Sequence, residues 1–197
     1  MTRIDQYLGL LVTLGLALTT TSHAQIKLID GPGSNRGWTI FGPPLNGGNI
    51  VKRNNELRIQ VDWPKTSWGV GISRALELPV DGRKVKGIRA EIKTLGTSNV
   101  RVHAGLSNKA GGNLSQDMRL AEEVTTDWKL FEFSAAEMMP ELFASLSPTF
   151  GNLNQDKVII VNLFFLKPRN NVHVKGSIIV RNPVLIYSEE DVYVNNY

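Results

Sequence analysis

The sequence predicts an all-β fold: an antiparallel β-sandwich of the jelly-roll type with one short helix. Three observations support this fold class. Apolar and polar residues alternate in many short segments, as expected of half-buried strands. Gly, Asn, Pro and Asp separate these segments, and these residue types favour turns. No linker or repeat interrupts the chain after residue 24, so we expect the strands to form a single domain, 25–197.

The composition limits the classes of protein to which the chain can belong. It has 197 residues, of which 42% are hydrophobic and 20% are charged, enough apolar material for a packed core. It has no cysteine, so disulfides, thiolate metal sites and a cysteine nucleophile are excluded. It has only three histidines, so a His-rich metal site or acid–base site is hard to build. The net charge of +4 is small for a nucleic-acid-binding surface, and we therefore expect no nucleic-acid partner.

The first 24 residues, 1–24, have the pattern of an export signal. Residues 7–18 form an apolar run, and Ser22 and Ala24 place small side chains at the −3 and −1 positions of a cleavage site. The run is short for a membrane span, and no later segment is both long and apolar enough to be one. A membrane anchor or a buried N-terminal helix is the alternative. We predict cleavage near Ala24, which would leave a periplasmic or secreted domain.

The strands of this domain follow from the alternation and from the turn residues between them. Asp81-Gly82, for example, is a turn signal between two long alternating segments. The predicted strands are 26–29, 38–41, 49–51, 56–62, 69–78, 85–94, 99–107, 119–124, 128–133, 157–166, 172–175 and 177–186.

One short helix is expected at 135–144. Ser134 is a favourable N-cap residue, and Glu137 stands where a capping box requires it. Pro140 lies inside this segment, so the helix is expected to be short or distorted.

Three stretches show a common order of motifs. Residues 68–94 hold two alternating strands, 124–133 contain Thr125 followed by Trp128-Lys129, and 157–185 hold an apolar strand and a second one that begins at Gly176. Together they resemble the galactose-binding-like jelly rolls, which include many carbohydrate-binding modules of bacterial polysaccharide-degrading enzymes. The resemblance covers about 37–187. It implies an exported, non-catalytic β-sandwich that binds a polysaccharide or oligosaccharide.

The resemblance also bears on metal binding. In many relatives, aspartates of the closing strand help to hold a structural calcium ion. Here that strand reads Val180-Arg181-Asn182, so that only Asn182 and the distant Asp30 would offer oxygens. We expect no obligatory calcium and no other cofactor or metal.

Tryptophans are the first candidate ligand-binding residues, because sugars stack on flat apolar rings. Trp63 and Trp68 flank the polar loop 64–67 between two strands, and we predict that both are exposed and contact ligand. The alternative is that the rings only cover one end of the sandwich. Trp128, in the strand that resembles the family's Trp-Lys strand, is expected in the core. Trp38 is expected in the core or at its rim.

Outward-facing polar side chains on three predicted strands give a second candidate surface. They are Arg89, Glu91, Arg101, His103 and Asn162. If the strands are neighbours, these side chains form one patch, to which Phe164 would add. The alternative is an ordinary solvated sheet face with cross-strand ion pairs.

Catalysis has weaker support in the sequence. The adjacent Glu122 and Glu123 would point to opposite faces of a strand, and the common nucleophile, phosphate and dinucleotide motifs are absent. A polysaccharide lyase or glycoside hydrolase is an alternative, because Arg101, His103 and Asn162 would supply a neutralising group and a base. An envelope module that binds a protein is another. Basic residues in the first half of the chain favour an acidic polysaccharide as ligand, or they serve only solubility.

Overall fold

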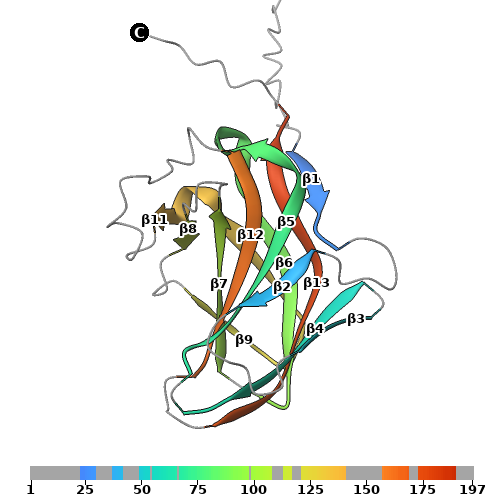
Figure 1. Cartoon of the computed structure of the whole chain (residues 1–197), viewed down its shortest axis with the longest axis vertical. Helices are drawn as coiled ribbons and strands as arrows, with labels where there is room; N and C mark the ends of the chain where they lie inside the picture. The colour runs from blue at the N-terminus through green and yellow to red at the C-terminus, as the bar shows by residue number, and fades with distance from the viewer. Residues whose placement is uncertain are drawn as a thin grey trace, which may run out of the picture.

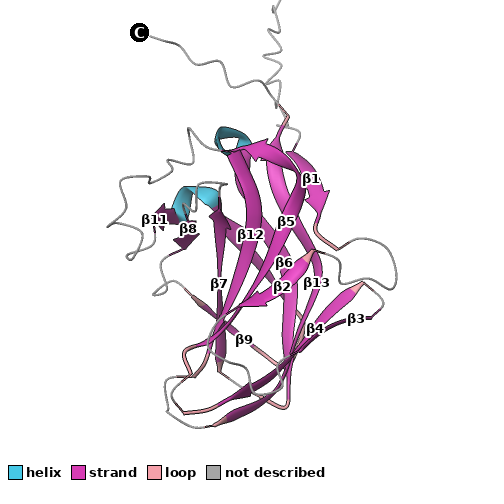
Figure 2. Ribbon diagram, in the orientation of Figure 1, coloured by secondary structure: helices cyan, strands magenta, loops and turns pink. Residues whose placement is uncertain are grey.

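Two antiparallel sheets form the protein, as the computed structural model shows (Figures 1 and 2). The structure describes residues 23–29, 37–41, 49–53, 55–65, 67–97, 99–107, 113–116, 121–140, 157–168 and 173–189. In these residues the chain outside the strands contains only loops and short 3-10 turns, and no helix is long and apolar enough to cross a bilayer. The predicted all-β sandwich is confirmed.

Sheet A contains the long closing strand at its centre. Its strands run in the order β10-β6-β13-β4-β3, and β1 also pairs with β13. They are β1 (His23–Lys27), β3 (Asn49–Arg53), β4 (Glu56–Trp63), β6 (Val85–Leu95), β10 (Lys129–Ser134) and β13 (Val174–Ser188). One edge of β13 is shared by two strands, because β4 pairs with its first half and β1 with its last five residues.

Sheet B lies against sheet A. Its strands run in the order β11-β8-β7-β12-β5-β2, and β9 also pairs with β7. They are β2 (Trp38–Phe41), β5 (Gly69–Asp81), β7 (Val100–Ser107), β8 (Asn113–Gln116), β9 (Glu122–Val124), β11 (Met138–Pro140) and β12 (Lys157–Leu166). We call the face of each sheet that packs against the other its inner face, and the opposite face its outer face.

The inner faces form one hydrophobic core. Every second residue of the central strands is fully buried, for example Leu57, Ile59 and Val61 on β4. The aromatic rings of Phe131 and Phe165 fill the space between the sheets. Burial of one such side chain contributes about 1.5–3 kcal/mol. Without cysteine, this packing is what holds the two sheets together.

The predicted helix at 135–144 is wrong in the described part of this segment. Residues Ala135–Glu137 form only a 3-10 turn, in which Ser134 Oγ accepts a hydrogen bond from the Ala136 backbone N–H. Met138–Pro140 then form β11 and pair with β8. The cap was therefore identified correctly, but strand pairing replaces the helix before Pro140. Residues 141–144 lie outside the described residues.

Two predicted strands, 172–175 and 177–186, are a single strand. β13 passes through Gly176, which pairs with Val61 of β4. A Cβ atom at Gly176 would lie 2.7 Å from the Leu95 carbonyl oxygen, so the glycine permits a close approach rather than a turn. At the other end of the chain, β1 begins at His23, and residues 1–22 of the predicted signal lie outside the described residues.

Candidate ligand-binding faces

The predicted polar patch is divided between the two sheets. β6 belongs to sheet A, so Arg89 and Glu91 lie on the outer face of that sheet. β7 and β12 are neighbours in sheet B, so Arg101, His103 and Asn162 lie together on the opposite side of the molecule. The single patch was expected only if the three strands are neighbours, and this condition is not met, because consecutive strands here cross from one sheet to the other. Alternation gives the face of a strand but not its sheet.

The two tryptophans of the 63–68 segment also differ. Trp63 has no exposed surface and belongs to the core, so the prediction that this ring is exposed is wrong. The physical reason is that β4 continues to Trp63, which shares the inner face with Leu57, Ile59 and Val61. Trp68 is 45% exposed, as predicted, and it stands directly before β5.

The other tryptophans are fixed by polar contacts. Trp38 is nearly buried, and its indole Nε1 donates a hydrogen bond to the Leu28 carbonyl oxygen at 2.8 Å. Trp128 was expected in the core, but it is only half-buried. The Arg181 guanidinium lies 4.1 Å from the centre of its ring and the Lys93 ammonium 4.6 Å, on the outer face of sheet A.

A chain of hydrogen bonds crosses the outer face of sheet B. Ser73 Oγ of β5 donates to Asn162 Oδ1 of β12 at 2.8 Å, and Asn162 Nδ2 donates to Ser107 Oγ of β7 at 2.9 Å. Asn162 is 6% exposed, while Ser73 is more accessible. The buried amide therefore fixes the rotamers of two hydroxyl groups on the neighbouring strands.

An aromatic pair lies beside this chain. His103 of β7 is directly opposite Phe164 of β12, and their rings stack with centroids 4.6 Å apart and planes 12° apart. His103 is 3% exposed and Phe164 is half-buried. On its other side Phe164 is opposite Gly71, which has no side chain to cover the ring. His103 therefore supports one face of an aromatic ring whose remaining surface is partly accessible.

Trp68 and Arg101 lie at the same end of sheet B. Leu166 pairs with Gly69 on one side and with Arg101 on the other, which places the two backbones roughly 10 Å apart. Gly69 has a φ of 143°, and a Cβ atom there would lie 2.0 Å from a backbone oxygen of β12. The Trp68 carbonyl accepts a hydrogen bond from the backbone N–H of Lys167 at 2.9 Å. These constraints hold the backbone that carries the Trp68 ring.

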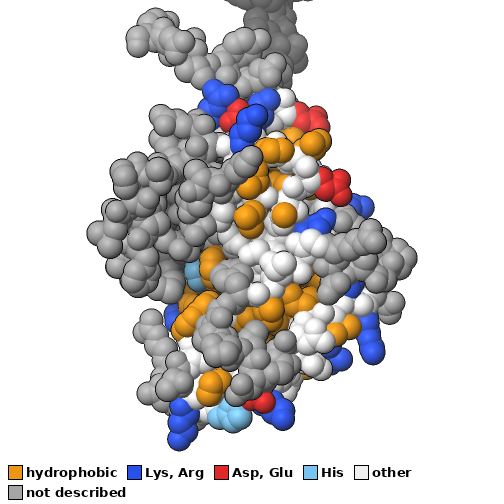
Figure 3. Space-filling model, in the orientation of Figure 1, with side chains coloured by type: hydrophobic (Ala, Val, Ile, Leu, Met, Phe, Trp, Pro, Cys, Tyr) orange, Lys and Arg blue, Asp and Glu red, His pale blue; other side chains and the backbone are white. Residues whose placement is uncertain are grey.

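The outer face of sheet B therefore combines apolar and hydrogen-bonding groups. Figure 3 shows hydrophobic side chains over much of the described surface on this side of the molecule, with charged side chains mostly towards its edges. The outward-facing positions 160, 162, 164 and 166 of β12, and the residues of β5 and β7 paired with them, hold no carboxylate. They are Gly69, Gly71, Ser73, Ala75, Arg101, His103, Gly105, Ser107, Ile160, Asn162, Phe164 and Leu166.

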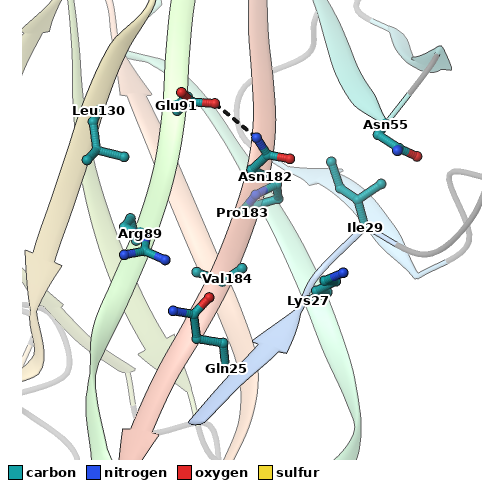
Figure 4. A pocket seen from close by; sticks show the side chains of 10 residues that line it. All are labelled: Gln25, Lys27, Ile29, Asn55, Arg89, Glu91, Leu130, Asn182, Pro183 and Val184. Carbon is teal, nitrogen blue, oxygen red and sulfur yellow. Dashed lines mark hydrogen bonds between the residues drawn. The ribbon is translucent and has the colours of Figure 1, made fainter. Parts of the chain in front are cut away.

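The outer face of sheet A contains a pocket of about 550 Å³ (Figure 4). Glu91 and Arg89 line it, together with residues of β1, β10 and β13. Arg181 donates to Glu91 from Nε at 2.5 Å and from a terminal nitrogen at 3.1 Å, and Asn182 Nδ2 donates at 3.0 Å. The Arg181 hydrogen bonds, aided by Asn182, hold the pKa of Glu91 below its ordinary value despite partial burial.

Metal ligands do not gather in the described part of the chain, where no three His, Asp or Glu side chains come together. Asn182, a predicted oxygen donor, is exposed and uses its amide nitrogen on Glu91. Asp30 lies outside the described residues. His173 is exposed, and its Nε2 contacts Asp62 Oδ1.

No protein-family model matches the chain, and no curated protein matches it. Among solved structures it is similar to a family 11 carbohydrate-binding module of the cellulase Lic26A-Cel5E of Clostridium thermocellum. The TM-score is 0.56 at 15% identity, over 89% of this chain and all of that one. The fold is that of these jelly-roll modules. A second family 11 module structure from the same organism, in complex with a β-1,3-1,4-mixed-linked tetrasaccharide, gives 0.55 at 18% identity, over 85% and 98% of the two chains.

The chain also resembles a part of a larger protein. An agarase, AgWH50C, matches with a TM-score of 0.56 at 9% identity, over 85% of this chain and 25% of that one. At these identities the likeness is one of fold, and the side chains on the two outer faces are this chain's own.

Sequence reasoning missed several residues of both faces. Ser73 and Ser107 join Asn162 into one hydrogen-bonded chain, and Lys27 and Gln25 line the sheet A pocket. Each serine directly follows a buried apolar residue, so the alternation in the sequence weakly predicts that both serines face outward. No such signal exists for the position of β1 beside β13, because two strands that pair over so long a separation in the chain leave no local pattern.

Proposed function

We propose that this protein is a non-catalytic module that binds a polysaccharide or oligosaccharide on the outer face of sheet B. The observation that carries the proposal is that Phe164, Arg101 and an oriented Ser73 hydroxyl share this face, with the exposed Trp68 at the end of the same sheet. In this proposal Asn162 and His103 support the contacting side chains, because only 6% and 3% of their surface is exposed.

The physical chemistry of sugars fits such a face. A pyranose ring has an apolar surface of C–H groups that stacks on aromatic side chains, and hydroxyl groups that need fixed donors and acceptors. Ser73 is already oriented by Asn162, and Phe164 by His103. Side chains that are held before binding lose less conformational entropy when the ligand arrives, which favours affinity.

The fold supports the same class of ligand. One similar structure is a module in complex with a β-1,3-1,4-mixed-linked tetrasaccharide, and another is an agarase. A mixed-linked β-glucan tetrasaccharide and an agaro-oligosaccharide are therefore the first two compounds to test, together with xylo- and manno-oligosaccharides as further neutral ligands.

Isothermal titration calorimetry of the protein against this neutral panel tests the proposal. We expect at least one ligand to bind, and Trp68→Ala and Phe164→Ala to weaken that binding by about tenfold or more, as loss of a central aromatic contact does. Leu95→Ala is the matched control, because Leu95 is an exposed apolar residue at the end of β6 in sheet A.

Two results would contradict the proposal. One is the absence of binding to any compound of the panel, with a protein complex recovered instead, which would favour an interaction module. The other is release of reducing ends or unsaturated products that His103→Ala abolishes, which would favour a hydrolase or lyase.

We further propose that the module is exported, with a signal peptide removed near Ala24. Cleavage there would leave Gln25 to Lys27 of β1 paired with Ile186 to Val184 of β13. The intact mass and N-terminal sequence of the protein recovered from its native cell test this directly. A mature chain that starts at Gln25 is expected, and an uncleaved chain would refute it.

A further inference from the structure

We propose that the pocket on the outer face of sheet A is a second ligand site, which binds the carboxylate of an acidic sugar residue through Arg89 and Lys27. This site lies on the opposite side of the sandwich from the face assigned to neutral sugar binding. That the ligand is a saccharide rests on the proposed function, whereas the affinity for an anion rests on the pocket alone.

Strand register places the two cations on either side of an apolar floor. Val184 of β13 is opposite Arg89 of β6 on one side and opposite Lys27 of β1 on the other. The two backbones are therefore about 10 Å apart, with the short Val184 side chain between them. Arginine and lysine side chains are long enough to meet at an anion above this valine.

The charges of the pocket leave these two cations available. The carboxylate of Glu91 is occupied by three hydrogen bonds from Arg181 and Asn182. Arg89 contacts Glu132 only at 4.0 Å, and the Glu132 side chain is 65% exposed, so this ion pair contributes little. Among the described residues no carboxylate pairs with Lys27. The pocket is therefore electropositive, and the negative charge of Glu91 at its edge is balanced by Arg181.

The remaining lining suits a sugar ring better than a bare ion. Pro183, Val184, Ile29 and the 54% exposed Leu130 give apolar surface, while Gln25 and Asn55 bring amide groups for hydroxyls. In Figure 4, Leu130 lies on one side of the pocket and Ile29 and Asn55 on the other, with Val184 between them. A volume of about 550 Å³ lies within the usual range for small-molecule sites.

A β-bulge in the closing strand builds this arrangement. Between Arg181 and Val184, β13 advances three residues while β6 advances two, and Asn182 adopts a left-handed φ of 49°. Such bulges re-aim side chains and are common beside functional sites. Here the bulge lets both Arg181 and Val184 face outward, so that the salt-bridged acid and the apolar floor are adjacent.

Titration of the whole protein with trigalacturonic acid, and with galactotriose as its neutral counterpart, tests the proposal. We expect the acidic trimer to bind at least tenfold more tightly than the neutral one at low salt, and this preference to fall as ionic strength rises. Arg89→Gln and Lys27→Gln should each weaken binding of the acidic trimer about tenfold, as loss of a charge-assisted hydrogen bond does. Lys86→Gln is the control, because it makes the same change of charge at an exposed position of β6 outside the pocket.

The outcomes separate this site from the neutral-sugar face. Loss of neutral-ligand binding in Trp68→Ala, with trimer binding retained, supports two independent sites. If Trp68→Ala abolishes binding of the acidic trimer and Arg89→Gln does not, the second site is refuted while the proposed function stands. Equal weakening by Lys86→Gln, or binding of inorganic sulfate as tight as that of the trimer, would also overturn the proposal. Thermal unfolding of each variant confirms that the change is in binding and not in folding.

Discussion

Replacement of Asn162 by alanine removes the centre of the hydrogen-bonded chain across sheet B. Its side chain is 6% exposed and makes two bonds of 2.8 and 2.9 Å, to Ser73 and Ser107. Each bond contributes about 1 kcal/mol net, so the variant should lose about 2 kcal/mol of unfolding free energy. For a chain of this length, 1 kcal/mol corresponds to about 2–4 °C in Tm. We therefore expect Tm to fall by about 4–8 °C.

A double-mutant cycle with Ser73→Ala separates this bond from the loss of packing. Urea unfolding of the two single variants and the double variant should give a coupling energy of about 1 kcal/mol, because the double variant has no bond left to lose. Gln60→Ala, at an exposed amide on β4, is the control and should leave stability nearly unchanged. A coupling energy near zero, or a loss no greater than that of Gln60→Ala, would refute the reasoning.

Three further predictions concern the core, the bulge and the turn before β5. Trp63→Ala should cost about 3–5 kcal/mol because the ring is fully buried, whereas Trp68→Ala should cost less than about 1 kcal/mol; similar losses in chemical denaturation would contradict the assigned burial. The folded-state pKa of Glu91 is depressed, so its charge stabilises the protein above its ordinary pKa of 4.5. The stability gap between wild type and Glu91→Gln should therefore be full at neutral pH and shrink as the pH falls below 4.5; a pH-independent gap in thermal unfolding would oppose this assignment. Gly69→Ala should destabilise by more than about 1 kcal/mol because its φ is 143° and the added Cβ meets a backbone oxygen at 2.0 Å; an unchanged Tm would show that the turn relaxes freely.

Much of the strand pattern was predictable, because it depends on local alternation. β12 was predicted with the same bounds, 157–166, and the ends of β2, β4, β6 and β7 differ by at most two residues. The strand predictions failed where pairing between distant strands decides the secondary structure. Pro140 ends up in a strand since β8 is there to pair with it, and nothing near residue 140 in the sequence indicates that partner.

The candidate site was predictable only as far as the faces of single strands. Alternation already placed Trp63 with Leu57, Ile59 and Val61, and the preference for loop-edge aromatics obscured that signal. It also placed Trp128 out of phase with the buried Phe131, which agrees with its position on the outer face. These two corrections needed no long-range information.

The division of the polar residues between the two sheets could be known only from long-range information, that is, from which strands pair. Arg89 and His103 both face outward from their strands, but β6 belongs to sheet A and β7, the next strand, to sheet B. The bulge at Asn182 is equally hidden, because its cause is the joint fit of β13 to β6, β4 and β1. As a result, the sequence indicated one patch where the structure has two faces.

Chemical-shift mapping of the isotope-labelled protein with a neutral oligosaccharide from the panel tests the central claim most directly. Binding on the outer face of sheet B predicts the largest shifts at the Trp68 indole and at the amides of Ser73, Arg101 and Phe164. Shifts confined to sheet A, or a spectrum unchanged by every compound, would contradict it.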